Sequence, residues 1–285
     1  MSCSDLCTKE KQRVPPDGYF KDKSVLITGA AHGLGAALAQ NLAGTCAQLL
    51  LLDIDEAALK KTALLCSVDP TFVQYRAVDL RSAQLVEQAY SELGPDYLPD
   101  VIIANAGVGG INPANAFSTE INETVMGINF FGTINTVAPF LQRMCDRKSG
   151  HIVAISSLAS LRGLPAAASY CASKAAQNSL MESWRLDLAR FNIHVSTILP
   201  GFIKTAMADH DEFDMPFTVS SDAAAQATLK AIAKKKKRYL FPWSMRFLAS
   251  LNSMLPIWLY DFLIPRLNRD AAKSEAKLFS AQKKL

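Results

Sequence analysis

The sequence predicts an α/β fold in which a doubly wound parallel sheet of about seven strands carries helices on both faces. Short apolar runs, such as 49–52 and 101–104, alternate with longer helical runs. Continuous apolar strands are typical of parallel sheets that helices cover on both sides. A glycine-rich turn follows the first apolar run, and polar residues follow most of the others. Right-handed crossovers bring the carboxyl ends of such strands to one edge, where we expect these polar residues to meet.

Length and composition favour one large domain. The chain has 285 residues and 49% hydrophobic content, enough for a large core, and no linker-like stretch divides its middle. The net charge of +4, without aromatic residues among the basic ones, argues against a nucleic-acid partner. The six cysteines are scattered, which indicates reduced thiols and a cytoplasmic protein. The four histidines lack metal-ligand spacing, so we expect no metal.

The N-terminus is predicted to be a flexible lead-in over residues 1–21. It is polar, contains Pro15 and Pro16, and lacks the apolar core of a signal sequence or anchor. The main domain is predicted over 22–241.

The first unit of this domain indicates a phosphate cradle. A strand is expected over 23–27, a turn with the spacing G-x-x-x-G-x-G over 29–35, and a helix over 36–44. Glycines let a backbone approach a pyrophosphate, and the free N–H groups of a helix N-terminus carry partial positive charge. The order strand, glycine turn, helix therefore predicts a dinucleotide site.

The second strand, expected over 49–53, ends in an acid that suits a ribose. Asp53 lies 18 residues after Gly35, near the distance at which a carboxylate receives the adenosine ribose hydroxyls. A carboxylate there would repel a 2′-phosphate, so NAD(H) is favoured over NADP(H). Asp53 could also cap the helix that begins near residue 56, and both roles can hold together.

The alternation continues to the end of the domain. Further strands are expected over 72–78, 100–104, 151–155, 193–199 and 239–241, with helices over 82–93, 122–146 and 170–191. Polar or glycine-containing signatures follow the first four of these strands, and they are Asp79, Asn105-Ala106-Gly107, Ser156-Ser157 and Pro200-Gly201.

Tyr170 and Lys174 are the candidate acid/base pair. They lie four residues apart in a run of good helix formers, so they share a helix face about 6 Å apart along the axis. A nearby ammonium is expected to lower the pKa of the phenol from its reference value of about 10. A tyrosine tuned in this way is a competent general acid/base. Such pairs also arise by chance on surface helices. The functional interpretation of this pair depends on the other motifs of the chain.

Taken together, these motifs resemble the short-chain dehydrogenase/reductase family, in its common single-domain branch with a Rossmann-type fold. The resemblance covers about residues 22–205. It is carried by Thr28-Gly-x-x-x-Gly-x-Gly35, Asp79, Asn105-Ala106-Gly107, Asn129, Ser157 with Tyr170 thirteen residues later, Lys174, and Pro200-Gly201 with Thr205. A mild departure is Ala104, because many relatives have a second asparagine in this motif.

The resemblance implies hydride transfer between a nicotinamide cofactor and a secondary alcohol or ketone. Tyr170 would exchange the proton, Ser157 would bond the substrate oxygen, Lys174 would also hold the nicotinamide ribose, and Asn129 would hold a water that links Lys174 to solvent. The implied cofactor-binding residues are Gly29, Ala31, His32, Gly33, Leu34, Gly35, Asp53, Ile54, Asp79, Leu80, Asn105, Ala106, Gly107, Tyr170, Lys174, Pro200, Gly201, Ile203 and Thr205. A homodimer or homotetramer, paired through the long helices, is also implied.

Other classes of function remain alternatives. A dinucleotide-binding sensor or scaffold without turnover would have the same fold, but relatives of that kind usually lose the tyrosine or the lysine. A methyltransferase on a similar fold would leave Tyr170, Lys174 and Ser157 without a role.

The C-terminal third bears on the substrate. Residues 202–222 are predicted to form a substrate lid. Residues 242–285 are predicted to be a helical extension, apolar over 243–264 but too interrupted by polar residues and proline to span a bilayer. Three roles stay open: a subunit contact that also covers the sheet, an apolar substrate mouth, or a dock on a membrane surface near the basic run 234–238.

The expected substrate is bulky and apolar, resembling a lipid, steroid or retinoid. A sugar intermediate of surface polysaccharide synthesis is the alternative.

Overall fold

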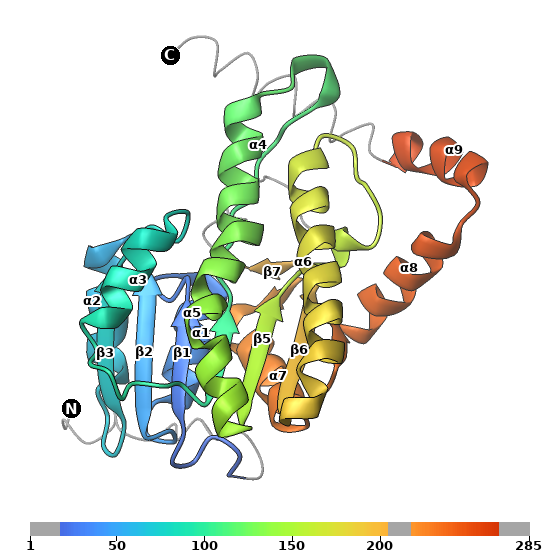
Figure 1. The fold of residues 1–285 in the computed structure, drawn as a ribbon. Coiled ribbons are helices and arrows are strands. Elements are labelled where there is room, and N and C mark those ends of the chain that lie inside the picture. The colour runs from blue at the N-terminus through green and yellow to red at the C-terminus, as the bar shows by residue number, and fades with distance from the viewer. Residues whose placement is uncertain (1–17, 205–217, 268–285) are drawn as a thin grey trace, which may run out of the picture.

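The computed structural model describes residues 18–204 and 218–267 (Figure 1). Seven parallel strands form one sheet in the order β3-β2-β1-β4-β5-β6-β9. Their bounds are β1 Ser24–Thr28, β2 Gln48–Asp53, β3 Phe72–Ala77, β4 Val101–Ala104, β5 Gly150–Ile155, β6 Ile193–Pro200 and β9 Arg238–Phe241. The winding reverses between β1 and β4, as it does in a doubly wound sheet. The predicted fold class is therefore confirmed.

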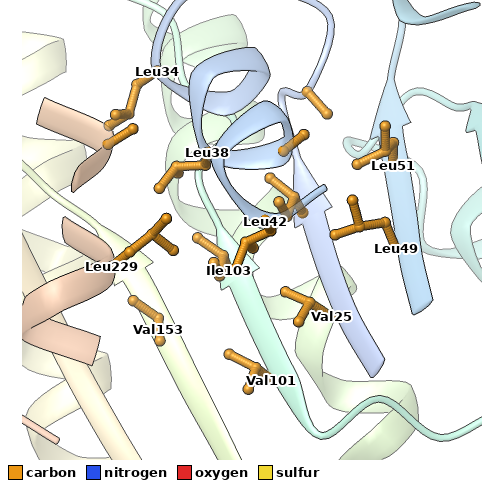
Figure 2. Packing of buried hydrophobic residues seen from close by; sticks show 14 of the residues in the cluster. Val25, Leu34, Leu38, Leu42, Leu49, Leu51, Val101, Ile103, Val153 and Leu229 are labelled. Atoms are coloured by element: carbon orange, nitrogen blue, oxygen red, sulfur yellow. The ribbon is translucent and has the colours of Figure 1, made fainter. Parts of the chain in front are cut away.

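Alternate side chains of each strand enter two separate cores. Helices α1 (Gly33–Leu42), α2 (Glu56–Cys66) and α7 (Ser221–Ala233) pack on one face of the sheet. Helices α3 (Ala83–Ser91), α5 (Gly132–Arg147) and α6 (Ala168–Asp187) pack on the other. Figure 2 shows the first core, where Leu38 of α1 and Leu229 of α7 lie against strand residues such as Ile103.

The apolar strand sequences follow from this two-sided cover. Residues 49–52 of β2 are four leucines with no exposed surface, and they alternate between the two cores. Fully burying one leucine contributes about 1.5–3 kcal/mol, so these strands strongly favour the sheet interior. The edge strand β3 is more exposed, in keeping with its mixed sequence.

Among the described residues, four α-helices begin at a side chain that accepts a hydrogen bond from a free backbone N–H. These caps are Asp55 for α2, Ser82 for α3, Ser118 for α4 (Thr119–Met126) and Ser220 for α7. The cap role considered for Asp53 is therefore wrong, because Asp55 takes it. Asp53 instead accepts bonds from backbone N–H groups around the end of β2.

The helix predicted over 122–146 runs over Thr119–Arg147 and is interrupted by a π-helical turn, Gly127–Phe131, between α4 and α5. The turn contains Asn129, and turns of this type are frequent at functional sites. Within the described ranges this run is the one helix long and apolar enough to cross a membrane. Part of its apolar side, including Val137 and Phe140, packs in the second core.

Two other observed boundaries differ from the predicted ones. Phe20 is fully buried in the first core and Lys21 pairs with Cys46, so the folded part starts before residue 22 and not after a lead-in of 21 residues. Helix α6 ends at Asp187, earlier than predicted, and a short 3-10 turn over Ala189–Phe191 follows it.

The C-terminal part adds two short strands and two helices. β7 (Ile203–Lys204) pairs with β8 (Val219–Ser220) at the two ends of the predicted lid, whose residues 205–217 lie outside the described ranges. Helices α8 (Trp243–Met254) and α9 (Ile257–Leu267) follow β9 and project beyond the sheet (Figure 1). Thr205 is therefore not described.

Candidate active site

A cavity of about 1630 Å³ opens where the carboxyl ends of the central strands meet. It lies at the switch point between β1 and β4, the position at which such sheets bind ligands. The predicted site residues that line it are Gly29, His32, Gly33, Leu34, Asp53, Ile54, Asp79, Leu80, Asn105, Ala106, Gly107, Ser157, Tyr170, Lys174, Pro200, Gly201 and Ile203. Ala31, Gly35 and Asn129 are buried and do not line the cavity.

The turn between β1 and α1 needs its glycines. Gly29 and Gly33 have positive φ angles of +66° and +52°. A Cβ on Gly35 would lie 1.9 Å from the carbonyl oxygen of Gly29, so the turn and the first turn of α1 touch backbone to backbone. No side chain caps the N-terminus of α1, which leaves its N–H groups to a ligand. This cradle fits the pyrophosphate of a dinucleotide.

Asn105 holds the glycine turn against β4. Its side-chain amide donates to the carbonyl oxygens of Thr28 and Gly29, at 2.9 and 3.2 Å. The Thr28 hydroxyl accepts bonds of 3.1 Å from the backbone N–H groups of Asn105 and Ala106. The asparagine motif therefore fixes the cradle as well as lining the cavity.

The part of the cavity beside the ends of β2 and β3 is lined by acidic side chains that have partners within the protein. The Asp53 carboxylate accepts bonds from the N–H groups of Ala31 and Ile54, at 2.9 and 2.8 Å. His32 contacts Asp55 at 2.9 Å. Arg81 forms a bidentate pair with Asp79, and this hydrogen bonding lowers the pKa of the Asp79 carboxyl. Sequence analysis missed Arg81, although an acid and a base two residues apart were a visible signal.

Tyr170 lies in the first turn of α6 and is half-buried. Burial raises the pKa of its phenol, and a hydrogen bond with Ser157 opposes that rise. Ser157 is placed by the end of β5, and its hydroxyl accepts a bond of 3.1 Å from the N–H of Ala159. The site therefore brings the tyrosine and the predicted serine together.

Lys174 lies one turn further along α6 and is almost fully buried. Its amine donates to the carbonyl oxygen of Ile155 at 2.8 Å and to the side-chain oxygen of Gln177 at 3.4 Å. Burial lowers the pKa of the amine to about 8. The expected lowering of the Tyr170 pKa by this cation is not found: burial of the phenol is the main cause of its raised pKa, and the influence that lowers it is the hydrogen bond with Ser157.

Asn129 is fixed by protein partners on every side. Its amide group exchanges two bonds with the backbone of Val108, at 2.8 and 3.0 Å, and donates to Ser173 at 2.9 Å. The π-helical turn thereby ties α4 and α5 to the loop after β4 and to α6. Gly107 lies beside this network, since a Cβ there would be 3.2 Å from the Lys174 amine.

Many of the side chains that line the cavity are apolar. Its wall includes Val108, Leu158, Leu161, Leu164, Phe202, Met245, Leu255 and Ile264. Helices α8 and α9 thus contribute to the mouth, one of the three roles left open for the extension. Arg162 holds this wall: it donates to the carbonyl oxygens of Asn252 and Leu255 at 2.8 Å each and stacks on the ring of Tyr260. No local sequence signal pointed to Arg162.

In the part of the chain that the structure describes, no group of three or more histidine, cysteine, aspartate or glutamate side chains is arranged to hold a metal ion.

The amino-acid sequence was compared with protein families and with known proteins. The family model described as short chain dehydrogenase matches residues 23–215. A protein of Myxococcus xanthus named "Uncharacterized oxidoreductase" is 32% identical over 260 residues, covering 86% of this chain and 97% of that protein.

Solved structures agree with the fold. A short chain dehydrogenase/reductase from Burkholderia phymatum, in complex with NAD, has a TM-score of 0.74 and 26% identity, covering 82% of this chain and 94% of that chain. A short-chain dehydrogenase from Sphingobium yanoikuyae, in complex with NADPH, has a TM-score of 0.72 and 24% identity. The match covers 82% of this chain and 97% of that chain.

Proposed function

Since the chain belongs to the short-chain dehydrogenase/reductase family, it is an oxidoreductase that uses a nicotinamide cofactor, and we propose that it interconverts a bulky, apolar secondary alcohol and its ketone. The observation that carries the proposal is one cavity that holds three groups: the Tyr170 hydroxyl, the Ser157 hydroxyl and the Lys174 amine. The apolar wall of the same cavity suits an apolar substrate.

The proton chemistry is assigned to Tyr170. During reduction its hydroxyl gives a proton to the substrate oxygen, and during oxidation the phenolate takes it back. Ser157 donates a hydrogen bond to the same oxygen, where negative charge develops. In the proposed reaction a charged Lys174 amine, one helical turn away, would favour the phenolate once it forms, although burial keeps the pKa of the phenol raised in this structure. A nicotinamide cofactor whose pyrophosphate is held by the glycine cradle would supply or accept the hydride.

We propose NAD(H) as the preferred cofactor. The Asp53 carboxylate at the end of β2 lines the cavity where the adenosine ribose would lie, and it would repel a 2′-phosphate. The basic side chains near this end do not offer a free phosphate clamp: His32 hydrogen-bonds with Asp55, and Arg81 forms an ion pair with Asp79. A hydrogen bond from a ribose hydroxyl to the remaining carboxylate lone pairs would select the unphosphorylated form.

The proposed function is tested with a panel of alcohols and ketones, assayed by NADH or NADPH absorbance. The panel contains long-chain, steroid-like and sugar members. We expect turnover with the apolar members and NAD(H). Turnover confined to sugars would overturn the proposed substrate class, and NADH binding without any turnover would favour a sensor or scaffold.

We also propose that the extension contacts a lipid surface. Trp243, Phe247 and Met254 lie on one side of α8 and are 82%, 66% and 82% exposed, and Trp258 of α9 is 71% exposed. Tryptophan is enriched at membrane interfaces. Residues 243–285 contain seven Lys or Arg and three Asp or Glu, so their net charge of +4 equals that of the whole chain. The exposed apolar side of α8, together with the basic composition of this segment of the sequence, suits anionic lipid.

Sedimentation with vesicles tests this contact. We expect binding to vesicles of phosphatidylcholine and phosphatidylglycerol that weakens with salt and is lost in the double variant Trp243→Ser, Met254→Ser. If the protein ignores the vesicles and light scattering shows the same variant to lose a subunit, the exposed face is a contact between copies.

A homodimer or homotetramer is proposed through the outer sides of α5 and α6. Phe131, just before α5, is 50% exposed, and Leu186 near the end of α6 is 64% exposed. Light scattering of the full chain tests this, and Leu186→Lys is expected to reduce the mass. A monomeric parent would contradict it.

A further inference from the structure

Gln177 is a fully buried amide that the sequence motifs did not single out. It lies on α6 three residues after Lys174, so the two side chains share a helix face. Its side-chain oxygen accepts a bond of 3.4 Å from the Lys174 amine. Its amide nitrogen donates to the carbonyl oxygen of Asn129 at 3.2 Å and to the hydroxyl of Thr133 at 2.7 Å.

Gln177 thus connects Lys174 to Asn129, which lies in the π-helical turn. Thr133 donates a second bond, of 2.9 Å, to the carbonyl oxygen of Asn129. The side-chain oxygen of Asn129 accepts from the backbone of Val108 at 2.8 Å. Both oxygens of Asn129 therefore have protein donors, and its connection to Lys174 runs through one glutamine amide.

We propose that Gln177 is a positioning residue for Lys174: its amide holds the amine against β5 and makes the link to Asn129 that the family resemblance assigns to a water. The proposal rests on the proposed function, in which Lys174 serves Tyr170. A buried amide differs from a water because its donor and acceptor ends are fixed by the helix. The amine therefore keeps one orientation, with its remaining N–H free for the cavity side.

The groups around the Lys174 amine allow the effect of the Gln177 contact to be measured as a change in the pKa of the amine. On α6 the titratable side chains within about one turn of Lys174 are Tyr170 and Cys171, and burial raises the pKa of the Cys171 thiol. The carbonyl of Ile155 from β5, the backbone of Gly107 after β4 and the turn around Asn129 surround the amine without an ionisable side chain. Desolvation is the cause of the lowered pKa of Lys174, with no ionisable neighbour contributing. A neutral acceptor on the amine favours its charged form, so loss of that acceptor lowers the pKa further.

The test measures the Lys174 pKa directly in the cofactor-free full chain. Lysine labelled with ¹³C at the ε carbon is titrated by NMR, and the Lys174 signal is assigned by its absence in Lys174→Met. We expect Gln177→Leu to lower the midpoint by about one pH unit or less. Gln177→Glu is expected to raise it, because a carboxylate replaces the neutral acceptor.

Asn41→Leu provides the matched control. Asn41 is a buried amide on α1 that bonds Ala37 and Asp222, far from the amine. We expect this variant to lower thermal stability as Gln177→Leu does, without moving the Lys174 midpoint. Unchanged midpoints in both Gln177 variants would overturn the proposal and leave Gln177 a packing residue.

A second arm uses activity. The pH profile of kcat/KM is expected to shift in the same directions in the two Gln177 variants. Absence of turnover by the parent would overturn the proposed function while the NMR midpoints still decide the Gln177 contact. Parent turnover with unshifted profiles and midpoints would overturn the Gln177 proposal alone.

Discussion

Lys174 of α6 donates a hydrogen bond of 2.8 Å to the carbonyl oxygen of Ile155, the last residue of β5. Ser157 follows Ile155 by two residues, and Tyr170 precedes Lys174 by one helical turn. This single bond therefore joins the helix that carries the proposed acid/base to the strand end that carries its serine partner. The amine remains in a buried position, where its charge is costly.

The first prediction concerns that cost. Because the folded state lowers the pKa of Lys174 from 10.5 to about 8, the unfolded chain binds more protons between these values. The stability of the parent should therefore rise across this window relative to Lys174→Met. We expect the difference in unfolding free energy to change by roughly 3 kcal/mol between pH 8 and 10.5 in urea titrations. Lys230→Met, at an exposed position, is the control for the removal of a lysine charge. A constant difference for Lys174→Met would contradict the buried charge.

The second prediction concerns the glycine cradle. A Cβ at residue 35 would collide with backbone at 1.9 Å, so Gly35→Ala must displace either the turn or α1. We expect NADH affinity to fall about tenfold or more and stability to fall by about 1–3 kcal/mol. Gly109→Ala is the control, since no atom lies within 4 Å of its Cβ position. Equal NADH dissociation constants for the two variants, from fluorescence titration, would count against the cradle.

The third prediction concerns cofactor choice. Asp53→Asn removes the charge and keeps one side-chain oxygen, which can accept either from Ala31 or from Ile54 and Asp55 but not from both sides. We expect NADH binding to weaken and the preference for NADH over NADPH to fall by about tenfold. Asp53→Ala should show the same trend with an added loss of stability, because three backbone bonds are lost. The two dissociation constants measure this, and an unchanged ratio would remove Asp53 from the ribose site.

The fourth prediction concerns the substrate mouth. Arg162→Met removes both bonds to the carbonyl oxygens of Asn252 and Leu255 and the stacking on Tyr260. We expect KM for a bulky ketone to rise about tenfold while the NADH dissociation constant stays within twofold. Arg143→Met, which loses a bond to Tyr97 away from the cavity, serves as the control. An Arg162 variant with unchanged KM would show that the wall does not shape the substrate site.

The sequence carried the information for the fold and the inner site because that information is local. An apolar run such as Leu49–Leu52 and the glycine spacing around Gly29 depend on neighbouring residues, so they were readable directly. The π-helical turn at Asn129 was not, because a widened turn depends on the tertiary bonds to Val108 and Ser173.

Contacts between distant segments were also beyond sequence reasoning. Arg162 meets Asn252 across 90 positions, and no periodicity predicts that approach. The pKa of Tyr170 was expected to fall from its spacing to Lys174, yet burial, which spacing does not reveal, raises it. Gln177 was readable in principle, as a polar residue on the Lys174 face of the helix.

The most direct test of the central claim is steady-state turnover by Tyr170→Phe, measured beside NADH affinity. If Tyr170 moves the proton, kcat should fall by about 10²–10⁴-fold while the NADH dissociation constant stays within twofold. Tyr239→Phe, on the edge strand β9, should retain parental activity. Undiminished turnover by Tyr170→Phe, at any pH where the parent is active, would contradict the assignment of Tyr170 as the general acid/base.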